Sequence, residues 1–210
     1  DIHMIDRRLF LSLSAAAGTA SSARCAATRA SAQETTVAEG TLVISRNGVP
    51  VGREAYRIVR ALAGGGQAYP ATATIPFDAL RISLRLTTDS TGVPLTYEAE
   101  VRAHGELSAH VDGSGRPGRF STLTKTPHGE AARDYVMGAK PLLLDDHAFD
   151  PYFFAALSPP GSQFSIIDPR AGSQATFRFE ERGQEAIRVG RGTASARHFA
   201  LITPTGGSRD

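Results

Sequence analysis

The sequence predicts an all-β fold: a strongly curled antiparallel sheet, a half-barrel or open barrel, with one short helix covering its concave side. Apolar and polar residues alternate along residues 93–102 and again along 81–87, which is the period of a half-buried strand. Asn47-Gly48 lies between two apolar runs, and this dipeptide is a strong hairpin signal. Strands repeated every 8 to 12 residues or so, with short turns, are typical of sandwiches, barrels and curled sheets.

The alternation also predicts which side chains point inward. The expected core face of the two central strands carries Ile82, Leu84, Leu86, Leu95, Tyr97, Ala99 and Val101. The expected solvent face carries Arg85, Glu98 and Glu100, and neighbouring charges such as Arg53-Glu54 are assigned to strand exteriors as well. Further strands are expected at 41–46, 49–60, 69–75, 106–112, 118–125, 130–137, 163–167, 174–181, 185–190 and 195–202. Glycine-containing segments at 64–66, 113–118 and 182–184 are expected to be turns.

One segment departs from the strand period and predicts a short helix over 150–157. Asp150 is expected to be the N-cap and Pro151 the first helical residue, where a missing N–H costs nothing. Phe153, Phe154 and Leu157 would then lie on one side of the helix and face the sheet. Such a helix either plugs a core or lines a pocket, and the pattern allows both.

The first 32 residues have the organisation of an export signal. Arg7-Arg8 precedes a weakly apolar stretch, and Ala30-Ser31-Ala32 provides the small residues that a signal peptidase accepts. The arginine pair followed by Leu9-Phe10-Leu11 resembles a twin-arginine signal, with Asp6 and Ser12 departing from the usual pattern. The alternative is an amphipathic N-terminal helix. We therefore expect a signal peptide at 1–32, a linker at 33–39 and one β domain at 40–210. The turn-forming residues at the end suggest that the natural protein continues beyond Asp210.

Composition narrows the classes of function. The formal net charge is +2, and residues 1–32 account for it, because they hold four arginines and two aspartates. The rest of the chain is balanced, which argues against a nucleic-acid partner. A single cysteine excludes an internal disulfide framework. No run of about 18 apolar residues is present, so no transmembrane helix is expected.

The densest group of potentially catalytic residues is Asp145, Asp146, His147 and Asp150. Carboxylates and an imidazole at this spacing suit a divalent cation or acid–base chemistry. On an extended segment, Asp145 and His147 would point to one side and Asp146 to the other. A metal site would need another ligand from elsewhere, and no spacing motif supplies it. The alternative is a turn followed by a helix cap, and no catalytic residue, metal or cofactor is assigned.

Three segments carry a resemblance to a known type of protein. These are Asn47-Gly48-Val49-Pro50-Val51-Gly52 with Tyr56, the run from Thr88 to Tyr97, and Leu144-Asp145-Asp146 before an aromatic helix. Together they resemble uncharacterised bacterial cell-envelope proteins with a curled sheet like that of the periplasmic lipoprotein carriers (LolA/LolB-like half-barrels). The resemblance covers about residues 40 to 202. It implies a concave apolar surface that holds an acyl chain or another apolar ligand, with no catalytic residues to assign.

The functional expectation is an exported periplasmic protein that binds a lipid, an acyl chain or an envelope component and catalyses no reaction. The expected ligand-binding residues are Tyr97, Phe153, Phe154 and Leu157. The first alternative is a structural or protein-interaction module of the cell envelope. The second is a metal-dependent hydrolase that uses Asp145 and His147. A carrier needs an apolar cavity of at least about 300 Å³, whereas an interaction module needs a filled interior and a long exposed edge strand.

Overall fold

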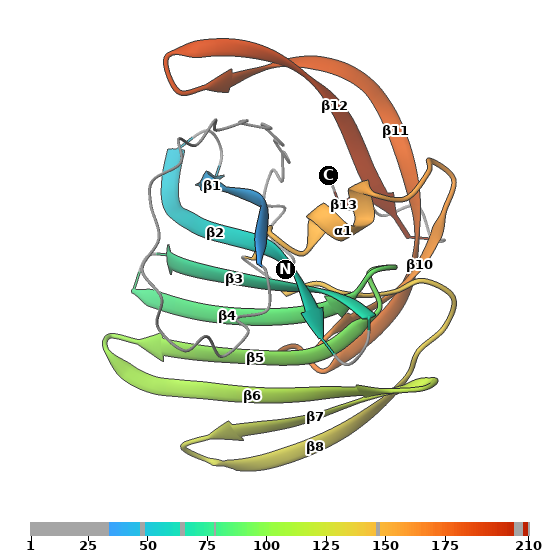
Figure 1. The fold of residues 1–210 in the computed structure, drawn as a ribbon. Helices are drawn as coiled ribbons and strands as arrows, with labels where there is room; N and C mark the ends of the chain where they lie inside the picture. The colour runs from blue at the N-terminus through green and yellow to red at the C-terminus, as the bar shows by residue number, and fades with distance from the viewer. Residues whose placement is uncertain are drawn as a thin grey trace, which may run out of the picture.

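The structure, a computed structural model, describes residues 34–46, 49–63, 66–77, 79–145, 148–203 and 208–209. They form two β-sheets and one short helix, α1 (Figure 1). The expected all-β architecture with a single short helix is therefore confirmed. The predicted signal peptide at 1–32 lies outside the described residues.

The larger sheet contains eight strands in the order of the sequence, each antiparallel to the next. Its strands are β1 (Thr35–Arg46), β2 (Val49–Ala63), β3 (Gly66–Phe77), β4 (Leu80–Asp89), β5 (Pro94–Ala103), β6 (Glu106–Arg116), β7 (Arg119–Thr126) and β8 (Gly129–Val136). The pairing of Arg46 with Val49 confirms the predicted first hairpin, although its turn residues at 47–48 are outside the described residues. The edges of this sheet are β1 and β8.

The smaller sheet has the order β13-β12-β11-β10-β9. Its strands are β9 (Pro141–Leu143), β10 (Gln163–Asp168), β11 (Ser173–Val189), β12 (Gly192–Ile202) and β13 (Ser208–Arg209). Strand β9 pairs in parallel with β10, and the connection between them carries α1 (Tyr152–Ala156). A parallel pair needs such a crossover, because the chain must return to the end of the sheet at which the first strand began before it can start the second.

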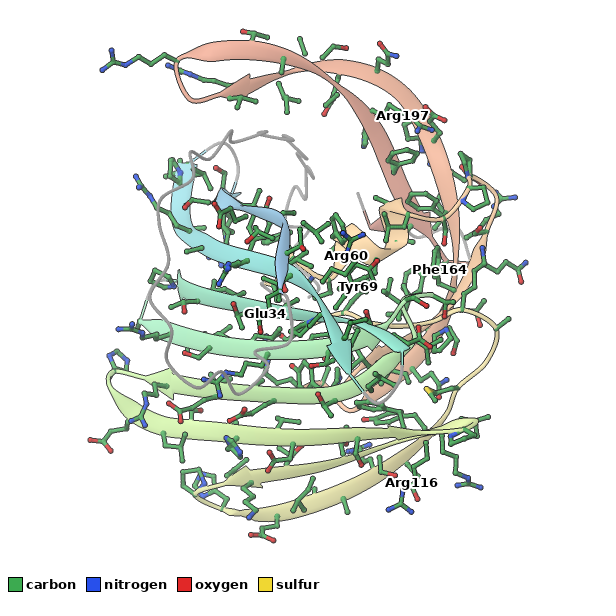
Figure 2. The ribbon with its side chains drawn as sticks, viewed as in Figure 1. Glu34, Arg60, Tyr69, Arg116, Phe164 and Arg197 are labelled. Carbon is green, nitrogen blue, oxygen red and sulfur yellow. The ribbon has the colours of Figure 1, made fainter. Side chains whose placement is uncertain are left out.

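The core lies between the two sheets, around α1. Figure 1 shows α1 between the larger sheet and strands β10 to β12. Phe154 of α1 meets Tyr69 of β3 edge to face, at 6.5 Å between ring centroids. Figure 2 labels Tyr69 and Phe164 near this helix, one from each sheet. The aromatic residues of α1 therefore join the two sheets in one hydrophobic core.

The predicted faces of β4 and β5 are correct at all inward positions except one. Ile82, Leu84, Leu86, Tyr97, Ala99 and Val101 are buried. Arg85 is exposed, whereas Glu98 and Glu100 are only half-buried. The inward prediction for Leu95 is wrong, since 38% of this residue is exposed. The register shifts so that Thr87 pairs with Thr96 but Thr88 pairs with Pro94, which leaves Leu95 as the extra residue of a β-bulge and turns Pro94 inward.

Of the predicted turns, 182–184 is part of a strand, and 113–118 is a turn only at 117–118. The segment 182–184 lies within β11, where a register shift between Glu181 and Gly183 marks a bulge and Gly183 has a φ of 111°. The segment 113–118 belongs mostly to β6, which continues to Arg116. Gly115 is required there, because a Cβ would lie 2.3 Å from the carbonyl oxygen of Pro94 at the β5 bulge. Glycine thus permits close approach of two strands at this position, and no turn is formed.

The predicted helix is present but shorter than expected. Phe153 and Phe154 are buried, whereas Leu157 is 62% exposed, because α1 ends at Ala156 and Leu157 follows as its C-cap. The expected N-cap is also wrong: Pro151 occupies that position without a side-chain cap hydrogen bond, and the Asp150 side chain is buried. No helix among the described residues is long and apolar enough to span a bilayer.

Candidate functional site

Buried acidic residues gather where the β9–α1 connection crosses the larger sheet. Asp145 and Asp150 in this connection are 2% exposed, and Glu54 of β2 is 0% exposed. Burying a carboxylate is costly unless it is paired or hydrogen-bonded. The partners of these three residues therefore decide what the site can do.

Asp145 is neutralised by a half-buried cation, Arg170. Its Oδ1 accepts hydrogen bonds from Nε of Arg170 at 2.8 Å and is 2.6 Å from Nη2 of the same guanidinium. Its Oδ2 accepts a 2.6 Å hydrogen bond from the hydroxyl of Tyr97 on β5. Arg170 lies in the turn between β10 and β11. One carboxylate thus ties the β9–α1 connection to both sheets.

Glu54 and Asp150 form a different kind of contact. Glu54 accepts two backbone hydrogen bonds, from the N–H of Phe149 to Oε2 at 2.6 Å and from the N–H of Asp150 to Oε1 at 2.7 Å. Neither carboxyl oxygen of Asp150 has a conventional donor within the described part of the chain. The neighbour of Asp150 is the Glu54 carboxyl group itself. Two neighbouring carboxyl groups can form a hydrogen bond with each other only when at least one of them carries a proton.

The electrostatics of the two groups follow from these contacts. Burial raises the pKa of Glu54 to about 7, although the amides of Phe149 and Asp150 act in the opposite direction. Burial and then the neighbouring Glu54 carboxyl hold the pKa of Asp150 well above its usual range. The two amides stabilise a charge on Glu54, so a proton held by only one of the two carboxyls favours Asp150.

The phenols nearby respond to the same charges. Burial, followed by the charge of Asp145, raises the pKa of Tyr97 well above its usual value. Burial, Glu54 and Asp150 raise the pKa of Tyr56. Burial of Arg170 acts to lower its pKa, but the charge and hydrogen bond of Asp145, together with Tyr97 and Asp168, outweigh this and raise it. Tyr97 and Tyr56 are therefore hydrogen-bond donors at neutral pH, and Arg170 is a permanent cation.

A pocket of about 220 Å³ lies beside α1. Its wall combines the β4–β5 turn, the start of β9, the end of α1 and the start of β10. The lining residues are Thr91, Gly92, Val93, Lys140, Pro141, Leu142, Phe154, Ser158 and Phe164. Lys140 has a φ of 47°, which is rare for a residue with a side chain. Its ammonium donates to Oγ of Ser162 at 2.7 Å and lies 6.0 Å from the Phe164 ring centroid.

The four residues predicted to bind a ligand occupy different places. Phe154 lines the pocket. The ring of Phe153 meets the ring of Phe154 edge to face, with centroids 5.5 Å apart. Tyr97 is buried against Asp145 instead, and Leu157 is exposed to solvent. The structure therefore brings together only the two phenylalanines.

Of the two residues in the hypothesis of a metal-dependent hydrolase, Asp145 and His147, the structure describes only Asp145. Both oxygens of Asp145 are occupied by Tyr97 and Arg170, while Asp146 and His147 lie outside the described residues. Within the described part of the chain, no group of three or more histidine, cysteine or acidic side chains is arranged to hold a metal ion. Asp145 here is an ion-pair partner.

Sequence reasoning missed Glu54, Arg170 and Lys140. Glu54 was assigned to a strand exterior with Arg53, but it shares its face of β2 with the buried Tyr56 and Ile58. The alternation of this strand was thus a usable signal for a buried acid. No comparable signal exists for Arg170, which follows Asp145 by 25 residues and lies in a turn.

No protein family model, no curated protein and no solved structure matches this chain. The geometry of the described residues therefore carries the functional argument.

Proposed function

We propose that this chain is an exported protein of the bacterial cell envelope that binds a small amphipathic ligand and catalyses no reaction. The pocket next to α1 is the observation that carries the proposal. Its volume of about 220 Å³ is below the usual range for drug-sized ligands but exceeds the roughly 150 Å³ of an apolar cavity known to bind benzene. It suits one short acyl chain.

The lining suggests the polarity of that ligand. Val93, Leu142, Phe154 and Phe164 provide apolar contacts, and Lys140 adds an ammonium group to the wall. An acyl chain with a carboxylate or phosphate head would bury its chain against these apolar side chains and place its charge beside the ammonium group of Lys140. Under this proposal the larger sheet corresponds to the wall of a LolA/LolB-like half-barrel, and α1 covers its concave side.

Binding of octanoate tests the proposal directly. We expect saturable binding by isothermal titration calorimetry, weakened about tenfold by Lys140→Met, which corresponds to about 1.4 kcal/mol. Ser158→Phe should fill the pocket and abolish binding. Ser195→Phe is the matched control, because Ser195 is exposed on β12 and does not line the pocket. Octanoate binding that survives Ser158→Phe would contradict this location.

Export is a separate part of the proposal, and it is supported by Arg7-Arg8 and Ala30-Ser31-Ala32. Replacing both arginines by lysine should leave the precursor in the cytoplasm of a bacterium with a twin-arginine pathway. Normal export of that variant, detected by cell fractionation, would contradict the twin-arginine assignment.

A structural or protein-interaction role is the second candidate. Strand β8 is an edge strand with mostly exposed residues, and Val136 on it is 66% exposed. Val43 on the opposite edge strand β1 is 58% exposed. Strands that end a sheet among the described residues, as β1 and β8 do, can accept a strand from a partner. Absence of octanoate binding by the unaltered protein at millimolar concentration would favour this role over ligand binding.

A further inference from the structure

The acidic pair of Glu54 and Asp150 connects β2 to the segment that leads directly into α1. Phe149 and Asp150 donate their amides to Glu54, and α1 begins two residues later, at Tyr152. Phe154 and Ser158, at the other end of this segment, line the pocket. The position of one pocket wall therefore depends on the contact between two carboxyl groups.

We propose that Glu54 and Asp150 form a proton-dependent latch that holds α1 against the larger sheet and so keeps the pocket closed on that side. With a proton on Asp150, its hydroxyl donates to the Glu54 carboxylate, and the two backbone amides complete the contact. Without that proton, two negative charges face each other in a buried site, and the segment separates from β2.

Among the described residues, the surroundings of the pair do not supply another way to neutralise it. Asp145 of the same connection raises the pKa of both carboxyls, and both carboxyls in turn raise the pKa of Tyr56 on β2. Asp145 is itself surrounded by Tyr97 of β5 and by Arg170 and Asp168 of the β10–β11 region. Within the described residues, no lysine or arginine forms an ion pair with Glu54 or Asp150. A proton is thus the neutralising ion that this geometry provides.

Linkage gives the sign of the effect. The closed state holds at least one proton that an exposed carboxyl group releases above about pH 5, and burial keeps the pKa of Asp150 well above that of an exposed aspartate. Opening therefore releases a proton. As long as the closed state retains that proton, the open population grows about tenfold per pH unit. The latch is tight in acid and loosens as the pH rises.

Hydrogen exchange of the two latch amides tests this without any ligand. Protection factors of the Phe149 and Asp150 amides, corrected for intrinsic exchange, should fall about a hundredfold between pH 6 and pH 8. In Asp150→Asn the side-chain amide replaces the proton donor permanently, so the same protection should change less than about threefold. Asp134→Asn is the matched control, because Asp134 is exposed on β8, and it should behave as the unaltered protein does.

The effect on ligand rests on the proposed function, so it has a separate measurement. The dissociation rate of octanoate, measured by NMR line shape, should rise with pH in the unaltered protein and stay constant in Asp150→Asn. Protection with equal pH dependence in both proteins would overturn the latch. A pH-dependent latch with a constant dissociation rate would overturn its control of the pocket, and a pH-dependent latch without octanoate binding would overturn only the proposed function.

Discussion

Asp145 and Asp150 lie five residues apart in the same connection, and both are buried, but their charges are handled in opposite ways. Asp145 keeps its charge and is paired with the guanidinium of Arg170 and the hydroxyl of Tyr97. Asp150 faces Glu54, and burial and this neighbour hold its pKa well above the usual range, so in the proposed latch one proton serves both carboxyls. An ion pair with arginine is insensitive to pH over the physiological range, whereas a shared proton is sensitive to it. The comparison teaches that the two ends of one segment can be fixed independently.

The largest expected effect concerns the ion pair. Arg170→Met leaves Asp145 buried with Tyr97 as its only hydrogen-bond donor among the described residues, and loss of one partner of a buried pair costs about 3 to 5 kcal/mol. Urea unfolding at pH 7 measures this loss. A decrease below about 1 kcal/mol would show that Asp145 is hydrated or finds another cation, and would remove the contrast.

The next effect is the pH dependence of the unaltered protein. Folding raises the pKa of Glu54 from 4.5 to about 7, so its stabilising contribution is fully present below about pH 4.5 and is lost as the pH rises to about 7. The expected loss is about 3 kcal/mol. Urea unfolding of the unaltered protein and of Asp134→Asn at several pH values should give parallel curves. Stability that rises from pH 5 to pH 7 would contradict the buried acidic pair.

Removal of the Tyr97 hydroxyl should lower the stability of the fold less than the loss of Arg170 does. Tyr97→Phe deletes the 2.6 Å hydrogen bond to Oδ2 of Asp145 and leaves the pairing with Arg170 intact. A hydrogen bond to a charged group contributes about 2 kcal/mol, so thermal or urea unfolding should register about that decrease. A neutral result would mean that water replaces the hydroxyl.

The smallest effect separates the two aspartates most clearly. Asp150→Asn supplies a neutral donor to Glu54 and should stabilise the fold by about 1 kcal/mol at pH 8, because the asparagine amide does not have to take up a proton when the chain folds, as the raised pKa requires of Asp150. Asp145→Asn should instead destabilise the fold, since it removes the charge that neutralises Arg170. Equal changes in the two variants, measured by urea unfolding at pH 8, would show that both ends respond alike.

The sequence predicted the parts of the molecule that depend on local patterning. Alternation gave the inward face of β4 and β5 correctly up to Leu95, where a bulge inserts one residue and reverses the faces. Periodicity placed Phe153 and Phe154 in the core but extended the helix one residue too far, to the exposed Leu157. Such errors arise because a bulge or a helix end depends on neighbouring strands, which a local pattern does not contain.

The acidic pair required information from distant parts of the chain. Asp150 has the sequence context of an N-cap, with proline after it, and nothing local indicates that its side chain turns toward β2 instead. Glu54 was recognisable in principle from its parity with Tyr56 and Ile58. Their contact was not predictable, because it depends on how the β9–α1 connection crosses the larger sheet.

The strictly sequential order of β1 to β8 has a kinetic consequence. Each strand pairs with its neighbour in the chain, so the sheet can form through successive hairpins with little loop-closure entropy at each step. Glu54, by contrast, meets Phe149 and Asp150 across 95 and 96 residues, and this contact forms after the hairpins. Interactions formed late change the unfolding rate and leave the folding rate nearly constant. Acid should therefore lengthen the lifetime of the folded chain without accelerating its formation.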